Sequence, residues 1–310
     1  MTKRVAVIGE CMLELQGEAF GAMTLGYGGD TFNTAVYLRR CGAAAGIEVA
    51  YATALGEDGL SAGLLERWRE QGIDTGLVRR IAGKMPGLYM IQVDPAGERS
   101  FHYWRESAAA RSYFDAAVTP IEDQAGEFDA LYLSGITLAI LPEKGRERLF
   151  VLMATMRARG AQVVFDNNYR PRLWADRETA RAAFERAFEL ATTALVTADD
   201  HQVLMGLPDL EAAIAHAKGL SAAEVLIKRG AASTLVREAG GKTWHEAATQ
   251  RVERVVDTTA AGDSFAGGYL ARRLAGEGAV ESAAHGNRVA ARVIGHRGAI
   301  ISAEVMGDLV

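Results

Sequence analysis

Residues 257–270 combine small side chains with a carboxylate in a way that suits phosphoryl transfer. Ala260, Ala261 and Gly262 allow close approach of the backbone to a ligand, and the helical pattern after Asp263 leaves N–H donors free at a positive helix end. A carboxylate there would repel bound phosphate, but it can remove the proton from an attacking hydroxyl while the amides stabilise the transferred group. We therefore predict Asp263 as the base and the backbone of residues 260–262 as an anion hole.

A parallel sheet is expected to position this segment, because short apolar runs alternate with longer stretches of helical period. The pattern predicts strands at residues 131–133, 163–165, 195–196 and 225–227, and helices at 31–40, 145–159 and 177–191. Ligands of open α/β sheets bind beyond the carboxyl ends of the strands. Glu10 follows the first apolar run, at residues 5–9, and polar residues follow the four predicted strands at 134–135, 166–170, 197–200 and 228–230.

One region breaks the alternation and predicts a small inserted sheet. Residues 87–93 and 99–105 have the pattern of two strands, joined by the Pro- and Gly-containing turn 94–98. Phe101 and Tyr103 project from one face of their strand together with Arg105. The irregular stretch 14–27 can pair with this hairpin. We expect a β-sheet lid, formed from about residues 11–30 and 86–107, within a single domain spanning 1–310.

Composition excludes several classes of protein. The 310 residues are 49% hydrophobic and 24% charged, which is typical of a globular protein and not of a disordered one. A formal charge of -5 has the wrong sign for a nucleic-acid partner. Cys11 and Cys41 form neither a disulfide framework nor a zinc pattern, and no apolar stretch suits a signal peptide or a membrane span. We expect a cytoplasmic protein without a membrane partner.

An isolated Gly-Asp pair at a helix start would more simply be an acid favoured by the helix dipole, but the longer pattern changes this interpretation. Asp-Thr-x-x-Ala-Gly-Asp at residues 257–263 resembles the carboxy-terminal signature of the PfkB, or ribokinase-like, family of carbohydrate kinases. Residues 28–33, Gly-Gly-Asp-Thr-Phe-Asn, resemble the Gly-Gly turn with which that family contacts its sugar. Within the family, the resemblance narrows to kinases of the sugar acid 2-keto-3-deoxygluconate. It extends along essentially the whole chain, through residues 7–12, 86–89, 97–105, 131–136, 165–174 and 257–268.

The resemblance implies a ribokinase-like three-layer α/β/α domain with a central, mostly parallel sheet and a small β-sheet lid. It also implies magnesium-dependent transfer of the γ-phosphoryl group of ATP to the primary hydroxyl of the sugar acid, giving the 6-phosphate. Asp263 would be the base, and Gly28, Gly29, Asp30 and Asn33 would contact the sugar. K⁺ is a further candidate cofactor.

A site that binds a sugar acid needs a positively charged side chain for the carboxylate, which a site for a neutral sugar does not need. Arginine suits this role, because its planar guanidinium can bind a carboxylate through two hydrogen bonds. Arg105 follows a lid strand and Arg170 follows a sheet strand at its ligand end. The resemblance places both near the substrate, together with Tyr89 and Tyr103. The alternative for each arginine is a solvated surface side chain.

The nucleotide is expected at the other predicted strand ends. Lys228, Arg229 and Gly230 close the strand 225–227, where the family binds nucleotide phosphates, and a basic Gly-containing turn suits that role. The resemblance adds Asn168 and, near the adenine ring, Asn287. Relatives often carry an Asn-x-x-Glu motif that organises magnesium, whereas this chain has Thr-Ala-Asp-Asp at residues 197–200. The sequence therefore identifies no metal ligand, although Asp200 could act on the magnesium through water.

Three alternatives remain open from the sequence. The chain could phosphorylate the related acid 2-keto-3-deoxygalactonate, or a neutral sugar such as fructose. It could also be a sugar-acid sensor without catalytic activity. Loss of Gly262 or Asp263 would favour a sensor, but this chain has both residues. The resemblance further implies a homo-oligomer.

Overall fold

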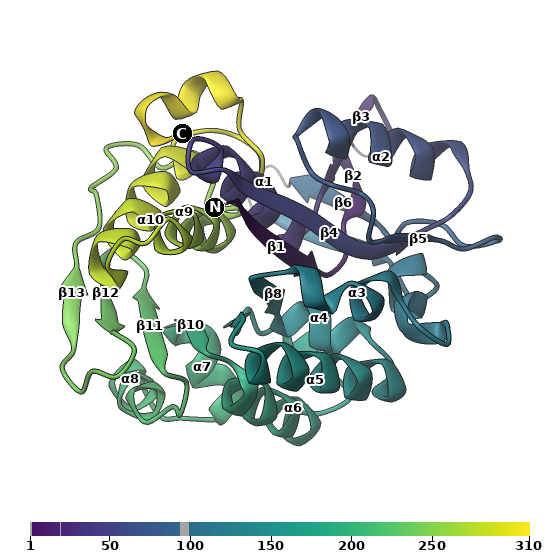
Figure 1. Ribbon diagram of the computed structural model, residues 1–310. Helices are drawn as coiled ribbons and strands as arrows, with labels where there is room; N and C mark the ends of the chain where they lie inside the picture. Colours follow the sequence, from purple (N-terminus) through teal and green to yellow (C-terminus); the bar gives the residue numbers. More distant parts are fainter. Residues whose placement is uncertain (1, 19, 94–98) are drawn as a thin grey trace.

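Buried aliphatic runs form the strands of a large twisted sheet (Figure 1). The structure is a computed structural model that describes residues 2–18, 20–93 and 99–310. Within these residues the strand order is β13-β12-β11-β10-β9-β8-β1-β4-β5, parallel from β11 to β5 and antiparallel at β12 and β13. The strands are β1 (Lys3–Ile8), β4 (Ile47–Leu55), β5 (Val78–Arg80), β8 (Ala130–Ser134), β9 (Gln162–Asp166), β10 (Thr193–Thr197), β11 (Glu224–Arg229), β12 (Ala232–Arg237) and β13 (His245–Ala247).

Helices cover both faces of this sheet, because successive strand residues point to opposite sides. Val5 and Val7 pack into one apolar cluster, whereas Ala6 and Ile8 pack into the other. The first face carries α1 (Asp30–Gly42), α2 (Gly59–Glu70), α9 (Ala261–Leu274) and α10 (Ala279–Ile294). The second carries α3 (Pro120–Asp123), α4 (Gly135–Ile140), α5 (Glu143–Ala158), α6 (Arg177–Leu190), α7 (Ala198–Met205) and α8 (Leu210–Lys218). Short 3₁₀ helices cover Ala109–Asp115, Ala125–Glu127, Pro171–Leu173 and Ala303–Leu309. The three-layer α/β/α fold is confirmed.

A separate four-stranded sheet is also present, with the order β3-β2-β6-β7. Its strands are β2 (Met12–Gly17), β3 (Met23–Gly28), β6 (Leu88–Val93) and β7 (Arg99–Trp104). The turn predicted at 94–98 lies outside the described residues. The small inserted sheet is confirmed, and the stretch 14–27 pairs with the hairpin as predicted, because β2 pairs along one edge with β6. The irregular stretch nevertheless contains most of two strands, since β2 pairs along its other edge with β3. Inter-strand pairing thus compensates for a weak local pattern.

The carboxyl ends of the parallel strands meet at one edge of the large sheet. Ser134 ends β8, Asp166 ends β9 and Lys228 lies near the end of β11. α1 packs against α9 (Figure 1), and the first turns of both helices meet there through Asn33 and Asp263. None of the described helices has the length and apolar character needed to cross a bilayer.

Candidate active site

Asp263 lies in the first turn of α9, where the chain makes an unusual bend. Ala260, which precedes the helix, has a left-handed backbone with φ 60°, and its carbonyl accepts a hydrogen bond from the amide of Ser264 at 2.8 Å. The Nδ2 atom of Asn33 donates to Asp263 Oδ2 at 2.8 Å, and Thr34 Oγ1 donates to the main-chain oxygen of Asp263 at 3.2 Å. Two residues in the first turns of α1 therefore hold Asp263, Asn33 through its carboxylate and Thr34 through its main chain.

The environment of Asp263 favours its protonated form. Burial raises the pKa of this carboxyl from 3.8 to about 7, and the nearby carboxylates of Asp30 and Asp166 add to the rise. The hydrogen bond from Asn33 and the charge of Lys228 act in the opposite direction. A carboxyl with a pKa near neutrality is well suited to exchange a proton with a hydroxyl.

The predicted anion-hole residues are arranged unequally around the start of α9. The amide of Ala261 donates to the carbonyl of Thr258 at 3.2 Å, so a ligand would have to replace this bond to use that donor. Gly262 faces Lys228, because a Cβ atom built on the glycine would lie 3.5 Å from the lysine Nζ. The positive helix end and the ammonium group thus adjoin each other.

Ion pairs connect the polar residues at the ends of β9, β10 and β11. Lys228 Nζ donates to Asp166 Oδ2 at 2.8 Å, and both side chains are largely buried. Asp166 Oδ1 is buried and has no hydrogen-bond partner among the described residues. Arg170 pairs with Asp200 at 3.2 Å, and burial raises the pKa of Asp200 against the charges of Arg170 and Lys228. Asp166 is therefore part of this cluster, although the sequence identified it only as a polar residue at a strand end.

The two arginines predicted to bind one carboxylate have different partners. Arg105 is buried and forms an ion pair with Glu10, whereas the side chain of Arg170 is 50% exposed and pairs with Asp200. Glu10 itself is buried, and desolvation raises its pKa despite the charge of Arg105. In this structure, each guanidinium is neutralised by its own carboxylate.

Aromatic side chains cover one face of the small sheet. The rings of Tyr89 and Tyr103 lie 5.9 Å apart, and Tyr103 is about half exposed. The Tyr89 hydroxyl donates to the carboxylate of Glu14, and burial together with this carboxylate raises the pKa of Tyr89. Gly28 packs beneath this hydroxyl, because a Cβ on the glycine would lie 3.2 Å from it.

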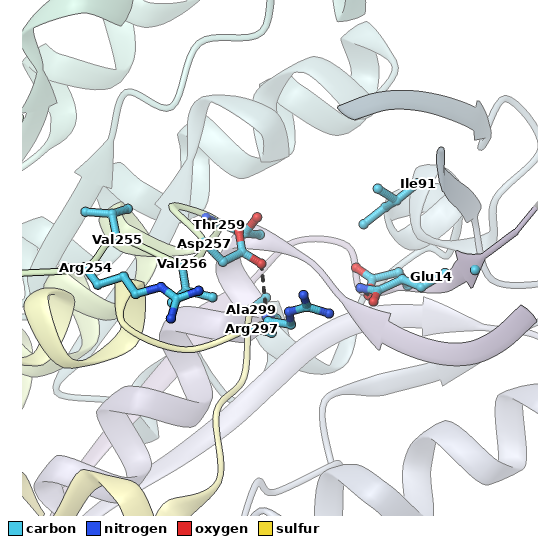
Figure 2. Close-up of a pocket in the computed structure, with 12 residues that line it drawn as sticks. Glu14, Ile91, Arg254, Val255, Val256, Asp257, Thr259, Arg297 and Ala299 are labelled. Atoms are coloured by element: carbon cyan, nitrogen blue, oxygen red, sulfur yellow. Dashed lines mark hydrogen bonds between the residues drawn. The ribbon is translucent and has the colours of Figure 1, made fainter. Parts of the chain in front are cut away.

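A cavity of about 480 Å³ separates the small sheet from the segment before α9. Glu14 and Ile91 lie on one side of it in Figure 2, and Asp257, Arg254 and Arg297 lie on the other. The Oδ2 atom of Asp257 accepts a hydrogen bond from the amide of Gly298 at 3.0 Å, which joins two loops of this wall. The volume lies in the range of small-molecule sites.

Three of the residues predicted to bind the nucleotide have hydrogen-bond partners other than those of Lys228. Asn168 Nδ2 donates to Asp30 Oδ2 at 2.8 Å, beside the hydroxyl of Ser134, so Asn168 belongs with the Gly-Gly turn. Arg229 has different partners from Lys228, because it bonds Ser233 and pairs with Glu246 at 3.4 Å. Asn287 is buried and bridges Thr234 to the carbonyls of residues 247 and 248, all at 3.1 Å. Gly230 is at the turn between β11 and β12 with φ 61°.

The sequence placed Glu10 and Asp166 among the polar residues at the ligand ends of strands but assigned neither of them a role, and it missed Glu14. Glu14 carries no such signal, because its partner Tyr89 is 75 residues away. The described residues contain no group of three His, Cys, Asp or Glu side chains able to hold a metal ion.

The comparisons with known proteins identify the family of the chain and its fold. A family model described as pfkB family carbohydrate kinase matches residues 2–306. A 2-dehydro-3-deoxygluconokinase of Escherichia coli (strain K12) is 46% identical over 308 residues, covering 99% of each chain. The solved 2-dehydro-3-deoxygluconokinase of Thermotoga maritima superposes with a TM-score of 0.83 at 22% identity, covering 100% of this chain and 98% of that one. A fructokinase with bound ATP from Xylella fastidiosa superposes with a TM-score of 0.82 at 24% identity, covering 96% and 94%.

Proposed function

Because the chain belongs to the PfkB family of carbohydrate kinases, we propose that it phosphorylates 2-keto-3-deoxygluconate with ATP to give the 6-phosphate. The observation that carries this proposal is the 46% identity to a 2-dehydro-3-deoxygluconokinase over 99% of each chain. The contact between Asn33 and Asp263, which holds the proposed base at the start of a helix, supports the same chemistry. The product is a phosphate ester of a primary hydroxyl.

Asp263 acts as the general base in the proposed mechanism. The primary hydroxyl of the sugar acid donates its proton to the free carboxylate oxygen, because Oδ2 already accepts from Asn33. The backbone at the start of α9 stabilises charge on the transferred group. The sugar acid lies between the Gly-Gly turn and the small sheet, which closes as a lid and excludes water.

The proposed binding site for the ATP phosphates consists of Lys228 and the carboxylates beside it. ATP and a divalent cation fit this cluster, because the buried Asp166 Oδ1 has no partner among the described residues and Asp200 lies near the same lysine. Asp166 and Asp200 would hold Mg²⁺, in part through water. When bound, Mg²⁺ neutralises charge on the ATP phosphates. A requirement for K⁺ stays a prediction.

The proposed function is tested by comparing substrates. In a coupled assay of ADP release, kcat/KM for 2-keto-3-deoxygluconate should exceed the values for gluconate, fructose and ribose. A higher value for any of these three would overturn the substrate assignment. The same assay on the gluconate- and galactonate-type epimers determines which one the site prefers. A cytoplasmic location, where ATP is available, and a homo-oligomeric state belong to the same proposal.

The activity should depend on pH through Asp263. Below a pH of about 7 the carboxyl is protonated and cannot accept the substrate proton, so kcat/KM should rise with pH through that region and then level off. Asn33→Ala removes a hydrogen bond that lowers the pKa of Asp263, so the rise should move to higher pH. A pH profile of kcat/KM that is the same in both proteins would contradict the role of Asn33.

Lys228→Met should selectively weaken the use of ATP. The substitution removes a positive charge and leaves the Asp166 carboxylate buried without its partner. We expect KM for ATP to rise roughly 10- to 100-fold, the cost of one charge-assisted hydrogen bond, and KM for the sugar acid to change less. Arg229→Met is the matched control, because Arg229 bonds Ser233 and Glu246 instead. Equal effects of the two substitutions on KM for ATP would contradict this assignment.

A further inference from the structure

The connections between the small sheet and the large domain converge on Glu10 and Arg105. Glu10 lies between β1 and β2, and Arg105 directly follows β7. A Cβ on Gly29, after β3, would lie 2.1 Å from the main-chain oxygen of Glu10. A Cβ on Gly87, before β6, would lie 2.7 Å from Glu10 Oε1 and 3.3 Å from Arg105 Cβ. All four strands of the small sheet are therefore connected to the domain beside this one ion pair.

The ion pair is buried but incompletely satisfied. Arg105 Nη2 donates to Glu10 Oε2, and the two side chains are only 7% and 1% exposed. Glu10 Oε1 and Arg105 Nε are also buried, and neither has a hydrogen-bond partner among the described residues. A buried charge pair that leaves both an acceptor and a donor unused is costly, so the free positions point to a ligand.

The arginine lies beside the aromatic face of the small sheet. Its Cζ atom is 5.8 Å from the centre of the Tyr103 ring, which in turn lies 5.9 Å from the Tyr89 ring. A guanidinium has five N–H donors in a fixed fork, so one carboxylate partner does not exhaust it. Arg105 can therefore remain bonded to Glu10 while another edge of its fork receives a second carboxylate.

We propose that Glu10 is a positioning residue that holds the Arg105 guanidinium at the base of the small sheet, with its remaining N–H edge available to the carboxylate of the sugar acid. This inference rests on the proposed function. Without the Glu10 charge, the guanidinium would be buried and unpaired, and it would turn toward solvent. Glu10 therefore acts on the substrate through Arg105.

The test is a double-mutant cycle with Glu10→Gln and Arg105→Ala. Glu10→Gln should raise KM for the sugar acid at least roughly tenfold, as expected for the loss of a charged hydrogen bond, while KM for ATP and kcat change less than about twofold. In the Arg105→Ala background, Glu10→Gln should cause no further rise in KM. Glu224→Gln is the matched control, because Glu224 is equally buried and pairs with Arg273 at 3.1 Å at the opposite end of β11 from Lys228. Glu224→Gln should lower Tm without changing KM for the sugar acid.

Several outcomes would overturn the role of Glu10. These are an unchanged KM in Glu10→Gln, an equal rise in KM with and without Arg105, or a similar rise in Glu224→Gln. If Glu10→Gln does not fold, Glu10→Asp retains the charge but shortens the side chain, and an unchanged KM in that variant would also overturn the proposal. Wild-type turnover of the sugar acid is measured first, because its absence would count against the proposed function itself.

Discussion

Asp263→Asn should lower kcat by roughly 10²- to 10⁴-fold, the usual contribution of a general base. The amide cannot accept the proton of the attacking hydroxyl. Its oxygen can still accept the hydrogen bond that Asn33 Nδ2 now donates to Asp263 at 2.8 Å, so the start of α9 should keep its position. KM for ATP and for the sugar acid should therefore change only a few-fold. Steady-state kinetics at pH 8 measure all three values.

Thermal unfolding provides the control for Asp263→Asn. Burial raises the pKa of Asp263 in the folded protein to about 7, well above its ordinary value of 3.8. This group therefore makes the wild type less stable as the pH rises from about 4 to 7, because the folded state resists losing the proton. The variant carries no charge there, so its Tm at pH 8 should equal or exceed that of the wild type. A folded variant with more than a tenth of wild-type kcat would remove Asp263 from the role of base.

Gly29→Ala should damage both the fold and the activity. Gly29 immediately precedes α1, and a Cβ there would lie 2.1 Å from the main-chain oxygen of Glu10, a backbone atom that cannot move independently. The start of α1, which carries Asp30 and Asn33, must shift. We expect a loss of about 1–3 kcal/mol in the free energy of unfolding, as for other overpacked sites. A displacement near 1 Å at the reacting groups should also lower kcat/KM roughly 100-fold.

Gly26→Ala is the matched control for Gly29→Ala. Gly26 is in β3, and the nearest atom to a Cβ there, an oxygen of the Glu14 side chain, would be 3.7 Å away, which is ordinary van der Waals contact. Its kcat/KM and its denaturation midpoint should stay close to wild type. Wild-type kcat/KM in Gly29→Ala would show that the close packing of Gly29 on Glu10 does not position Asn33 and Asp263.

The sequence allowed prediction of features that depend on neighbouring residues. The start of α9 and the small residues before Asp263 lie within one short segment, so helix and turn chemistry sufficed to place them. The alternation of apolar runs similarly predicted the parallel sheet, and the family resemblance implied its two helical layers; both are confirmed. The hairpin of β6 and β7 could be recognised because its two strands are close in sequence.

Contacts between distant residues could not be predicted in this way. Arg105 pairs with Glu10, 95 residues away, and only the folded chain shows that this guanidinium already has a carboxylate partner. Lys228 and Arg229 are adjacent and both basic, but in the folded chain Lys228 pairs with Asp166 and Arg229 pairs with Glu246. Asn287 similarly finds its partners only when α10 packs on β12.

Identifying the phosphorylated product tests the central proposal most directly. Wild-type protein is incubated with ATP, Mg²⁺ and 2-keto-3-deoxygluconate, and the products are followed by phosphorus NMR. We predict one phosphate ester at the primary hydroxyl of the sugar acid for each ADP formed, and almost none with Asp263→Asn. Release of inorganic phosphate instead of an ester, or an ester at another position, would contradict it.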